Sequence, residues 1–480
     1  MKKIFFINII ILIAANILIK PFYLFGIDRT VQNLVGSTIY GTYIAVFTLT
    51  MLFQIVSDLG IRYWNNREVA QHEHLFKKYF ANLVVLKLGL AVLYVGACYL
   101  AAWILNYDAY YVKILTLVIV SNWLADFILY MRTNISGLQY YYRDSFLSIL
   151  DKLLMIIICS VLLWANPFDE PFQIEWFVYA QIVSNFISCI VALVFIRKHL
   201  KGIQFRFNLP FLLVILRQTR DYTIVVFLAA IYMRADTIML DRLVEDGAAE
   251  TGIYYAAYRL ITAANMVGVL FSGLLLPMFA RQIKEKEDIG ELLAFSFQIL
   301  YAIAIVISFC TIFYRNEIMI SLYTEGNEYA GSILGIVVIS FIAASCMYIF
   351  GSLLIANENL KQLGFISFLT AIVNVSLGYL LIPTYKAIGA AITTTATHFF
   401  ILIAAIYLVV RIFKLKPNYS LLMRLVGFTI SVWLINYGIA NWLDWEWLQQ
   451  LMTAFALSSV MIFVFKLIDL KMLIELVKSK

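Results

Sequence analysis

Residues 231–260 read IYMRADTIMLDRLVEDGAAETGIYYAAYRL, and this stretch decides the fold. It begins in an apolar run that carries Arg234 and Asp236, and this run ends at Asp241 and Arg242. A second apolar run then begins at a Gly-x-Tyr. A charge at the centre of a membrane helix costs at least ~2.5–3.5 kcal/mol on insertion scales. We therefore expect the charged side chains of this run to face protein or water and not lipid.

The composition of the whole chain indicates a membrane protein. Of its 480 residues, 63% are hydrophobic and 14% are charged, and the mean hydropathy is +0.88. Soluble domains are about 25% charged. Apolar segments recur from end to end, which predicts an all-α polytopic membrane protein. The net charge of +7 does not indicate a nucleic-acid partner, because the basic residues are distributed between apolar runs.

The apolar runs predict about fourteen spans, since a membrane-spanning helix needs roughly 20 apolar residues. The chain begins like a signal peptide, but its apolar run is long and no A-x-A site follows, so we predict an uncleaved first span. The predicted spans are 4–26, 39–60, 79–105, 111–131, 147–165, 174–196, 221–240, 251–276, 292–314, 331–355, 363–382, 387–410, 421–441 and 450–467.

The distribution of charge between spans predicts the orientation. Lysines and arginines, including Lys2 and Lys3, gather at the start, in every second connection and in the tail, whereas the other connections are acidic. Basic loops face the cytoplasm, so both termini are predicted to be cytoplasmic. The longest cytoplasmic connection contains an apolar stretch at 209–216. It predicts a short helix in the membrane interface, and a partner-binding loop is the alternative.

A repeated pattern predicts an internal duplication. The sequence IDRTV (27–31) recurs as LDRLV (240–244), and a Gly-x-Tyr follows each copy, at 41–43 and at 252–254. Six predicted spans separate the copies, so both run in the same direction, as in parallel transporter repeats. Coincidence in a biased composition is the alternative. The repeat predicts six-helix lobes around a central cavity at 1–200 and 221–410, an interfacial linker at 201–220, and two additional helices with a cytoplasmic tail at 411–480.

The charges inside the spans are the candidate functional residues. At 1.5 Å per residue, Lys20 lies about 24 Å past Ile4 and Arg234 about 18 Å past Tyr222. Alignment of the two Asp-Arg pairs places these two cations at nearly the same depth, in the outer part of the bilayer. Arg259 lies about 12 Å into its span, near mid-depth.

These residues predict a cavity for an anionic ligand, because arginine donates paired hydrogen bonds that suit phosphate. Salt bridges between helices are the alternative reading of Arg234 and Asp236. Asp58 and Arg62 are four residues apart near the cytoplasmic edge, which favours a local pair or a gate. The candidates for the cavity are Arg234, Arg259, Lys20 and Lys87, and those for coupling or gating are Asp236, Asp241, Asp58, Arg62 and Asp126.

Other chemistry finds no support in the sequence. The five cysteines lie in apolar segments without metal spacing, and the four histidines form no ligand set. There is no nucleotide-binding glycine loop, no His-Glu-x-x-His and no nucleophile elbow. We therefore predict a secondary-type transporter with no cofactor and no metal, and not an enzyme.

Two stretches carry a family resemblance. GSTIYGTYIAVFTLTMLFQIVSDLGIRYWNNREVA (36–70) resembles the second-span signature of bacterial polysaccharide flippases. The opening stretch resembles their seventh and eighth spans, with Arg-x-Asp-x-x-Met-Leu followed by Gly-x-Tyr. The family is the polysaccharide transporter branch of the multidrug/oligosaccharidyl-lipid/polysaccharide (MOP) exporter superfamily, which includes the O-antigen flippases.

The resemblance implies a function at the bacterial inner membrane. The expected activity is flipping of an undecaprenyl-pyrophosphate-linked oligosaccharide, such as an O-antigen, capsule or exopolysaccharide unit, to the periplasmic leaflet. Cationic cavity residues would receive the pyrophosphate. Arg234 lies in a matched motif, whereas the role of Lys20 is inferred from the repeat. The implied partners are the lipid-linked oligosaccharide, membrane lipids, and a glycan polymerase with its export machinery.

Three other functions remain open. A cation-coupled multidrug or small-molecule exporter of the same superfamily would need an acidic cavity. A membrane-embedded glycan polymerase or ligase would expose one large periplasmic loop, but the longest predicted outer loop, about 315–330, is short and acidic. A structural assembly protein would not need buried charges in both halves.

Overall fold

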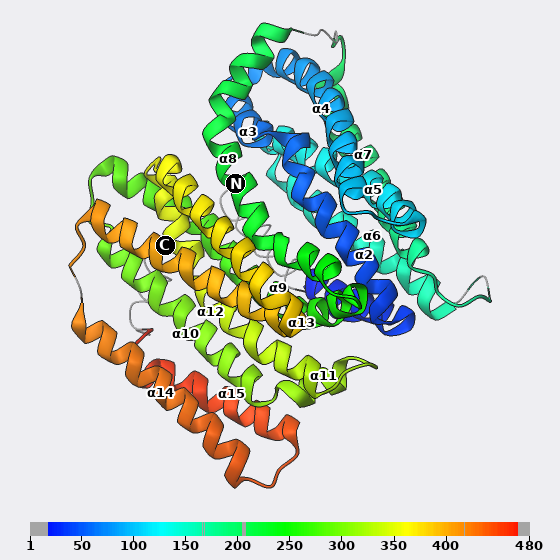
Figure 1. The fold of residues 1–480 in the computed structure, drawn as a ribbon. Coiled ribbons are helices and arrows are strands. Elements are labelled where there is room, and N and C mark those ends of the chain that lie inside the picture. Colours follow the sequence, from blue (N-terminus) through cyan, green and yellow to red (C-terminus); the bar gives the residue numbers. More distant parts are fainter. Residues whose placement is uncertain (1–17, 166, 168, 204–207, 417, 469–480) are drawn as a thin grey trace. The chain divides into compact units, whose positions relative to one another are not determined.

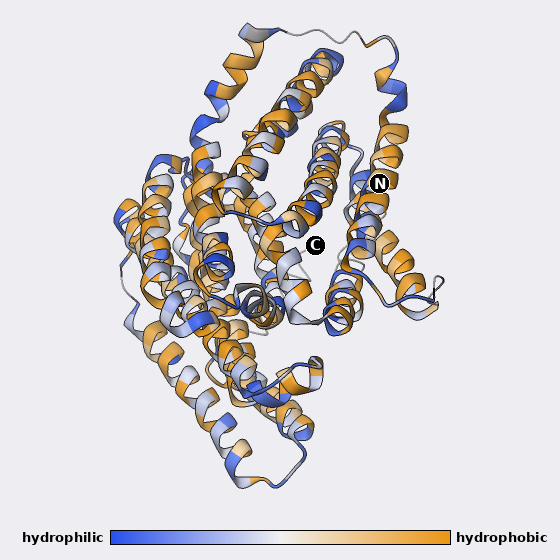
Figure 2. Cartoon of the chain, turned by 45° about the vertical axis from the view of Figure 1, so that its right-hand side comes forward, coloured by the Kyte–Doolittle hydropathy of each residue, from blue (hydrophilic) through white to orange (hydrophobic). Residues whose placement is uncertain are grey.

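The computed structural model describes residues 18–165, 167, 169–203, 208–416 and 418–468. The predictions for the start of the first span (4–17), for Lys2 and Lys3, and for the lysines after 468 lie outside these residues. Every regular element of the described chain is helical (Figure 1). Twelve of the described helices are long and apolar enough to cross a membrane, and hydrophobic residues cover most of their length (Figure 2).

Two of these twelve helices are broken in the middle. The first runs from Leu18 through η1 (Tyr23–Asp28) and α2 (Arg29–Asp58), with a break at Gly36, where φ is 81°. The other, α13 (Leu360–Phe413), is broken at Lys386. Gly36 adopts its positive φ at little cost because it has no Cβ. The breaks fall between the predicted spans 4–26 and 39–60 and between 363–382 and 387–410. The twelve membrane-length helices of the described residues therefore make fourteen segments, as predicted.

The other helices follow the predicted spans. The structure divides into two compact units, Met1–Gly252 and Ile253–Lys480, and α9 begins in the first and continues into the second. The lobe boundaries drawn from the repeat stay a prediction. The remaining elements are α3 (Ile61–Gln71), η2 (Glu73–Leu75), α4 (Phe76–Ile104), α5 (Ala109–Gly137), α6 (Tyr141–Ser160), η3 (Val161–Ala165), α7 (Ile174–Leu200), α8 (Leu209–Leu243), α9 (Gly247–Glu285), α10 (Gly290–Phe313), α11 (Arg315–Leu322), α12 (Glu328–Ala356), α14 (Tyr419–Trp442) and α15 (Trp447–Val464).

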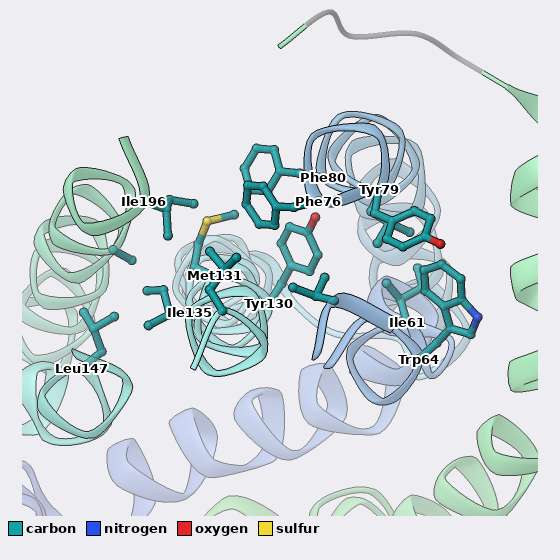
Figure 3. Packing of buried hydrophobic residues seen from close by; sticks show 14 of the residues in the cluster. Ile61, Trp64, Phe76, Tyr79, Phe80, Tyr130, Met131, Ile135, Leu147 and Ile196 are labelled. Carbon is teal, nitrogen blue, oxygen red and sulfur yellow. The ribbon is translucent and has the colours of Figure 1, made fainter. Parts of the chain in front are cut away.

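An aromatic cluster in the first unit fixes the short helix α3. Figure 3 shows the rings of Trp64 and Tyr79 side by side. Phe211 at the start of α8 stacks on Tyr79, with ring centroids 5.9 Å apart, and the Trp64 indole N–H donates to Gln218 at 2.6 Å. These contacts hold the first turns of α8 in line with the remainder of that helix. The prediction of a separate interfacial helix at 209–216 is therefore wrong, because α8 runs unbroken from Leu209 to Leu243.

The tyrosines of the two Gly-x-Tyr motifs make equivalent contacts. Tyr43 accepts a hydrogen bond from Gln181 of α7, the sixth predicted span, at 2.8 Å. Tyr254 shares a 2.7 Å hydrogen bond with Thr394 in the second segment of α13, the twelfth predicted span. Each motif thus ties the second span of its repeat to the sixth, which supports the duplication.

The glycines of the same motifs allow a close backbone approach in the first unit. A Cβ on Gly41 would overlap the carbonyl oxygen of Ala248, and a Cβ on Gly252 would overlap that of Ser37. The Gln32 side chain is buried beside them and donates to the Gly252 carbonyl at 2.9 Å. The beginning of α9 is therefore fixed to α2.

In the second unit, the two additional helices pack on α10. Phe428 and Val432 of α14 are fully buried in a cluster with Ala302 and Val306. The hydroxyl of Tyr301 shares a 2.9 Å hydrogen bond with that of Thr429. The predicted extra pair is thus part of the core of this unit.

Candidate substrate cavity

A network of buried charges joins three helices of the first unit. Lys87 of α4 places its Nζ 2.7 Å from Asp126 Oδ2 of α5 and 3.4 Å from Asp58 Oδ1 at the end of α2. The same Nζ donates to the Ser57 carbonyl at 3.1 Å. The side chains of Lys87, Asp126 and Asp58 are 3%, 1% and 4% exposed. A buried charge is costly unless an opposite charge lies beside it, and each charge of this network has one within 4.0 Å.

Arg62 extends the network to the edge of a cavity. The turn at Leu59 and Gly60, both with positive φ, ends α2 and begins α3. It brings Arg62 Nε to 3.1 Å from Asp58 Oδ1 and 3.9 Å from Asp126 Oδ1. Unlike the three buried residues, the Arg62 side chain is 30% exposed. It therefore presents one face to open space while the other face is paired.

This open space is a cavity of about 470 Å³ within the first unit. A second ion pair lies on its wall, where Arg132 Nε of α5 is 2.7 Å from Asp144 Oδ1 in the first turn of α6. A cavity of this size is in the range of small-molecule sites, which is about 300–1,000 Å³. Its polar lining consists of Asp58, Arg62, Asn66, Arg132, Thr133, Ser136, Asp144 and Tyr222, and its apolar lining of Ile55, Leu129 and Val226.

The periodicity of α5 explains how one helix serves both the core and the cavity. Leu129, Arg132, Thr133 and Ser136 follow the spacing i, i+3, i+4, i+7, which places them on one face of a helix. The residues between them face the aromatic core, where Tyr130, Met131 and Ile135 are fully buried. The cavity face of α5 is therefore a polar stripe in an apolar span.

The structure brings four of the predicted site residues together. Asp58 and Arg62 form the close pair that their spacing favours, and Lys87 and Asp126 join them. Lys87 does not line the cavity, because it is enclosed between carboxylates behind the wall. Sequence reasoning missed Arg132 and Asp144 as site residues, since a basic residue near the end of a span is ordinarily read as a marker of topology. The polar stripe on α5 was the signal for it.

Asp241 has a structural contact at the other end of α8. Its carboxylate accepts from the Tyr111 hydroxyl at 2.8 Å and lies 2.7 Å from Arg242 Nε. The Arg242 guanidinium lies over the rings of Tyr107 and Tyr111, 4.2 and 4.6 Å from their centroids. Burial, and then the charge of Asp241, raise the pKa of Tyr107, which lies between two spans. Asp241 thus ties the end of α8 to the start of α5 and does not line the cavity.

Lys20 and Arg234 lie at different distances from the ends of their helices. The first helix continues eight residues past Asp28 to its break at Gly36, whereas α8 ends two residues past Asp241. Measured from these ends, Lys20 lies about 24 Å along its helix and Arg234 about 14 Å along α8. The alignment of the two Asp-Arg pairs did not include this difference in helix length, and the equal depth of the two cations stays a prediction.

Neither Arg234 nor Asp236 lines the cavity of the first unit. Arg234 is half-buried, whereas Asp236 is buried and accepts from the backbone N–H of Thr237 at 2.7 Å. Lys20 is half-buried near the cavity wall and lies within electrostatic reach of Arg132, Asp151 and Lys152.

Arg259 is fully buried in the second unit. Its Nη1 donates to the Tyr323 hydroxyl at 2.8 Å, and that hydroxyl donates to the Ala256 carbonyl at 3.0 Å. The guanidinium also lies over the rings of Tyr255 and Tyr323, 5.8 and 5.6 Å from their centroids. In this conformation Arg259 is enclosed by tyrosines and has no exposed surface for a ligand.

A family model matches the sequence of this chain, and solved structures share its fold. A family model described as "Polysaccharide biosynthesis protein" matches residues 6–283. No curated protein matches the chain in sequence. Lipid II flippase MurJ in an inward closed conformation matches the structure with a TM-score of 0.71 and 13% identity, over 95% of this chain and 98% of that one.

Two further structures have the same fold at lower similarity. An inward-facing multidrug resistance MATE family transporter of the MOP superfamily has a TM-score of 0.63 and 12% identity, over 80% of this chain and 92% of that one. A MOP superfamily transporter from Pyrococcus furiosus Vc1, titled for the reverse polarity of its binding pocket, has a TM-score of 0.60 and 10% identity, over 85% and 96%. The predicted all-α fold is confirmed, and these solved transporters share it.

Proposed function

The chain belongs to the polysaccharide biosynthesis protein family, and on that premise we propose that it flips a lipid-linked oligosaccharide across the bacterial inner membrane. The substrate is an undecaprenyl-pyrophosphate-linked repeat unit of an O-antigen, a capsule or an exopolysaccharide. The observation that carries the proposal is the charged cavity of about 470 Å³ among helices that are otherwise apolar. A purely structural membrane protein has no need of such a cavity.

The position of the cavity fits loading from the cytoplasm. Its lining comes from the end of α2, the start of α3, the last turns of α5, the first turn of α6, and Tyr222 and Val226 of α8. The connections at this end of the unit are the basic ones, which predicts that they face the cytoplasm. In this predicted orientation, a head group in the cytoplasmic leaflet would enter at the cavity.

The cavity also supplies the polar partners that a head group needs while it crosses the membrane. A polar head group that crosses hydrocarbon without partners loses hydrogen bonds worth about 4–8 kcal/mol for each amide or hydroxyl. Arg62, Arg132, Asp144 and Ser136 offer such partners inside the unit. The polyprenyl tail needs none and stays in lipid during transport. Transport follows if the substrate binds the inward and outward states with different affinities.

Lys20 is the candidate contact for the diphosphate in the first unit. Around it, Arg132 is paired with Asp144 at 2.7 Å and Lys152 with Asp151 at 3.4 Å. Among the described residues, Lys20 itself makes no ion pair within 4.0 Å, so it contributes the surplus positive charge of this group. A glycan polymerase and its export machinery are the partners that this role implies.

The function is tested by following the substrate across the membrane. The protein is depleted from its host, and the lipid-linked oligosaccharide on the periplasmic face of spheroplasts is labelled with periodate, which does not cross the membrane. The proposal expects the labelled fraction to fall while the total pool rises, with recovery when the wild-type chain is restored. An unchanged labelled fraction would show that the protein does not flip this substrate.

A further inference from the structure

The cavity of the first unit offers hydrogen-bond donors and acceptors in adjacent pairs. Arg62 lies 3.1 Å from Asp58, Arg132 lies 2.7 Å from Asp144, and Ser136 lines the same space. We propose that this cavity is a carbohydrate subsite, which binds the uncharged sugars of the lipid-linked substrate and not its diphosphate. The inference rests on the proposed function and deepens it, because it assigns one part of the substrate to one set of side chains.

The balance of charge argues against a diphosphate in this cavity. Each arginine on its wall is paired with an aspartate on the same wall, and Lys87 behind the wall is paired with Asp126. A diphosphate that took an arginine from its carboxylate would leave that partly buried carboxylate without a partner, which is strongly destabilising. The displaced carboxylate would then lie close to the phosphate and repel it.

Sugar hydroxyls fit the same lining without breaking a pair. A hydroxyl both donates and accepts, so neighbouring hydroxyls can accept from a guanidinium N–H and donate to the carboxylate beside it. The side chains of Arg62, Arg132 and Asp144 are 30%, 26% and 24% exposed, so part of each remains available while the pairs stay intact. The ring of Tyr222 adds an apolar surface with a polar tip, which suits the mixed surface of a sugar.

The surplus positive charge lies beside the cavity and not in its lining. Lys20 is near Arg132 but does not line the space, and Lys152 of α6 lies over the Tyr23 ring of the first helix. A diphosphate near Lys20 would therefore lie outside the sugar-binding pairs. Arg132 both lines the cavity and lies near Lys20, so it is the residue between the sugar-binding pairs and the surplus charge.

The test measures protection of a cysteine in the cavity wall. The natural cysteines are all buried, so Ser136→Cys introduces one reactive thiol into the full-length protein in detergent. Its alkylation by N-ethylmaleimide is timed with glycan released by mild acid from the host's own lipid-linked pool, and separately with inorganic pyrophosphate. For a Kd of about 1 mM, glycan at about 10 mM occupies about nine-tenths of the sites and slows alkylation about tenfold.

The proposal expects protection by the released glycan and none by pyrophosphate at the same concentration. Asp144→Asn should reverse this preference, because it removes an acceptor and leaves Arg132 with an uncompensated charge. Asp221→Asn is the matched control, since it removes a carboxylate from the exposed pair with Arg220 and should change neither result. Protection by pyrophosphate alone, or by neither probe, would overturn the subsite.

This result is independent of transport, because no leaflet is involved. Glycan protection in a protein that does not flip would contradict the proposed function and leave the subsite standing. Flipping without glycan protection would contradict the subsite and leave the proposed function standing.

Discussion

Lys87 and Asp126 form the shortest ion pair of the buried network in the first unit, with Nζ 2.7 Å from Oδ2. Both side chains are at most 3% exposed. They join α4 to α5, and Lys87 also reaches Asp58 at the end of α2. The pair therefore joins α4 to α5 and α2, the two helices of this network that line the cavity.

Removal of the cation alone should strongly destabilise the protein. Lys87→Met leaves Asp126 with only Arg62, 3.9 Å away, as a partner. Breaking one side of a buried pair costs about 3–5 kcal/mol. The thermal midpoint of the protein in detergent, followed by size-exclusion chromatography, should fall clearly below that of the wild type.

The double variant Lys87→Met with Asp126→Leu should recover most of this loss, because Asp58 keeps Arg62 as its partner. Lys113→Met is the control, since that cation is 59% exposed in its pair with Glu175 and its loss should matter much less. Equal midpoints for Lys87→Met and Lys113→Met would show that the buried network does not hold the helices.

Gly41 should not tolerate a side chain. Gly41→Ala forces a methyl group into the Ala248 backbone, which cannot move aside as a flexible side chain would. We expect a large loss of folded protein, measured as the monodisperse fraction after solubilisation, and the same for Gly252→Ala.

The chain offers a matched control in Gly89 and Gly96 of α4, where an added Cβ meets nothing within 4 Å. Alanine at these exposed helical positions should stabilise by about 0.5–1 kcal/mol. If Gly41→Ala behaved like Gly89→Ala, the close approach of α2 and the start of α9 would be refuted.

Arg259 is enclosed by Tyr255 and Tyr323, which predicts that it stabilises the fold and does not bind substrate. Tyr323→Phe removes the acceptor of the Arg259 hydrogen bond and the donor to Ala256, which should cost about 1–3 kcal/mol. Arg259→Lys should lower the thermal midpoint in the same way, because lysine lacks the planar fork of donors. A variant Arg259→Lys with the wild-type midpoint but no flipping would instead assign Arg259 to the substrate.

Much of the fold was predictable because bilayer thickness imposes a length on every span. Apolar runs of about 20 residues gave the helices, and even the connection at Lys386 lay between two predicted spans. The unbroken start of α8 was not predictable, because it depends on Phe211 meeting Tyr79 from a distant part of the chain.

The candidate site was predictable only in part, for a similar reason. Lys87 and Asp126 were visible as charges within apolar runs, but nothing in their local sequence pairs them. Arg132 lies close to a span end, where a basic residue is ordinarily read as a marker of topology. The structure shows its place in the cavity wall, where Asp144, across the α5–α6 turn, lies 2.7 Å away.

The most direct test of the account fills the cavity and measures transport. Ser136→Trp places an indole in the cavity wall, and Ile157→Trp places the same group on a surface of α6 that is 53% exposed and apolar. Both are reconstituted in liposomes with a fluorescent undecaprenyl-pyrophosphate-linked oligosaccharide, and the rate at which the outer leaflet loses or gains dithionite-sensitive label is recorded. The account predicts that Ser136→Trp abolishes flipping while Ile157→Trp keeps the wild-type rate. Wild-type flipping by a folded Ser136→Trp protein would contradict it.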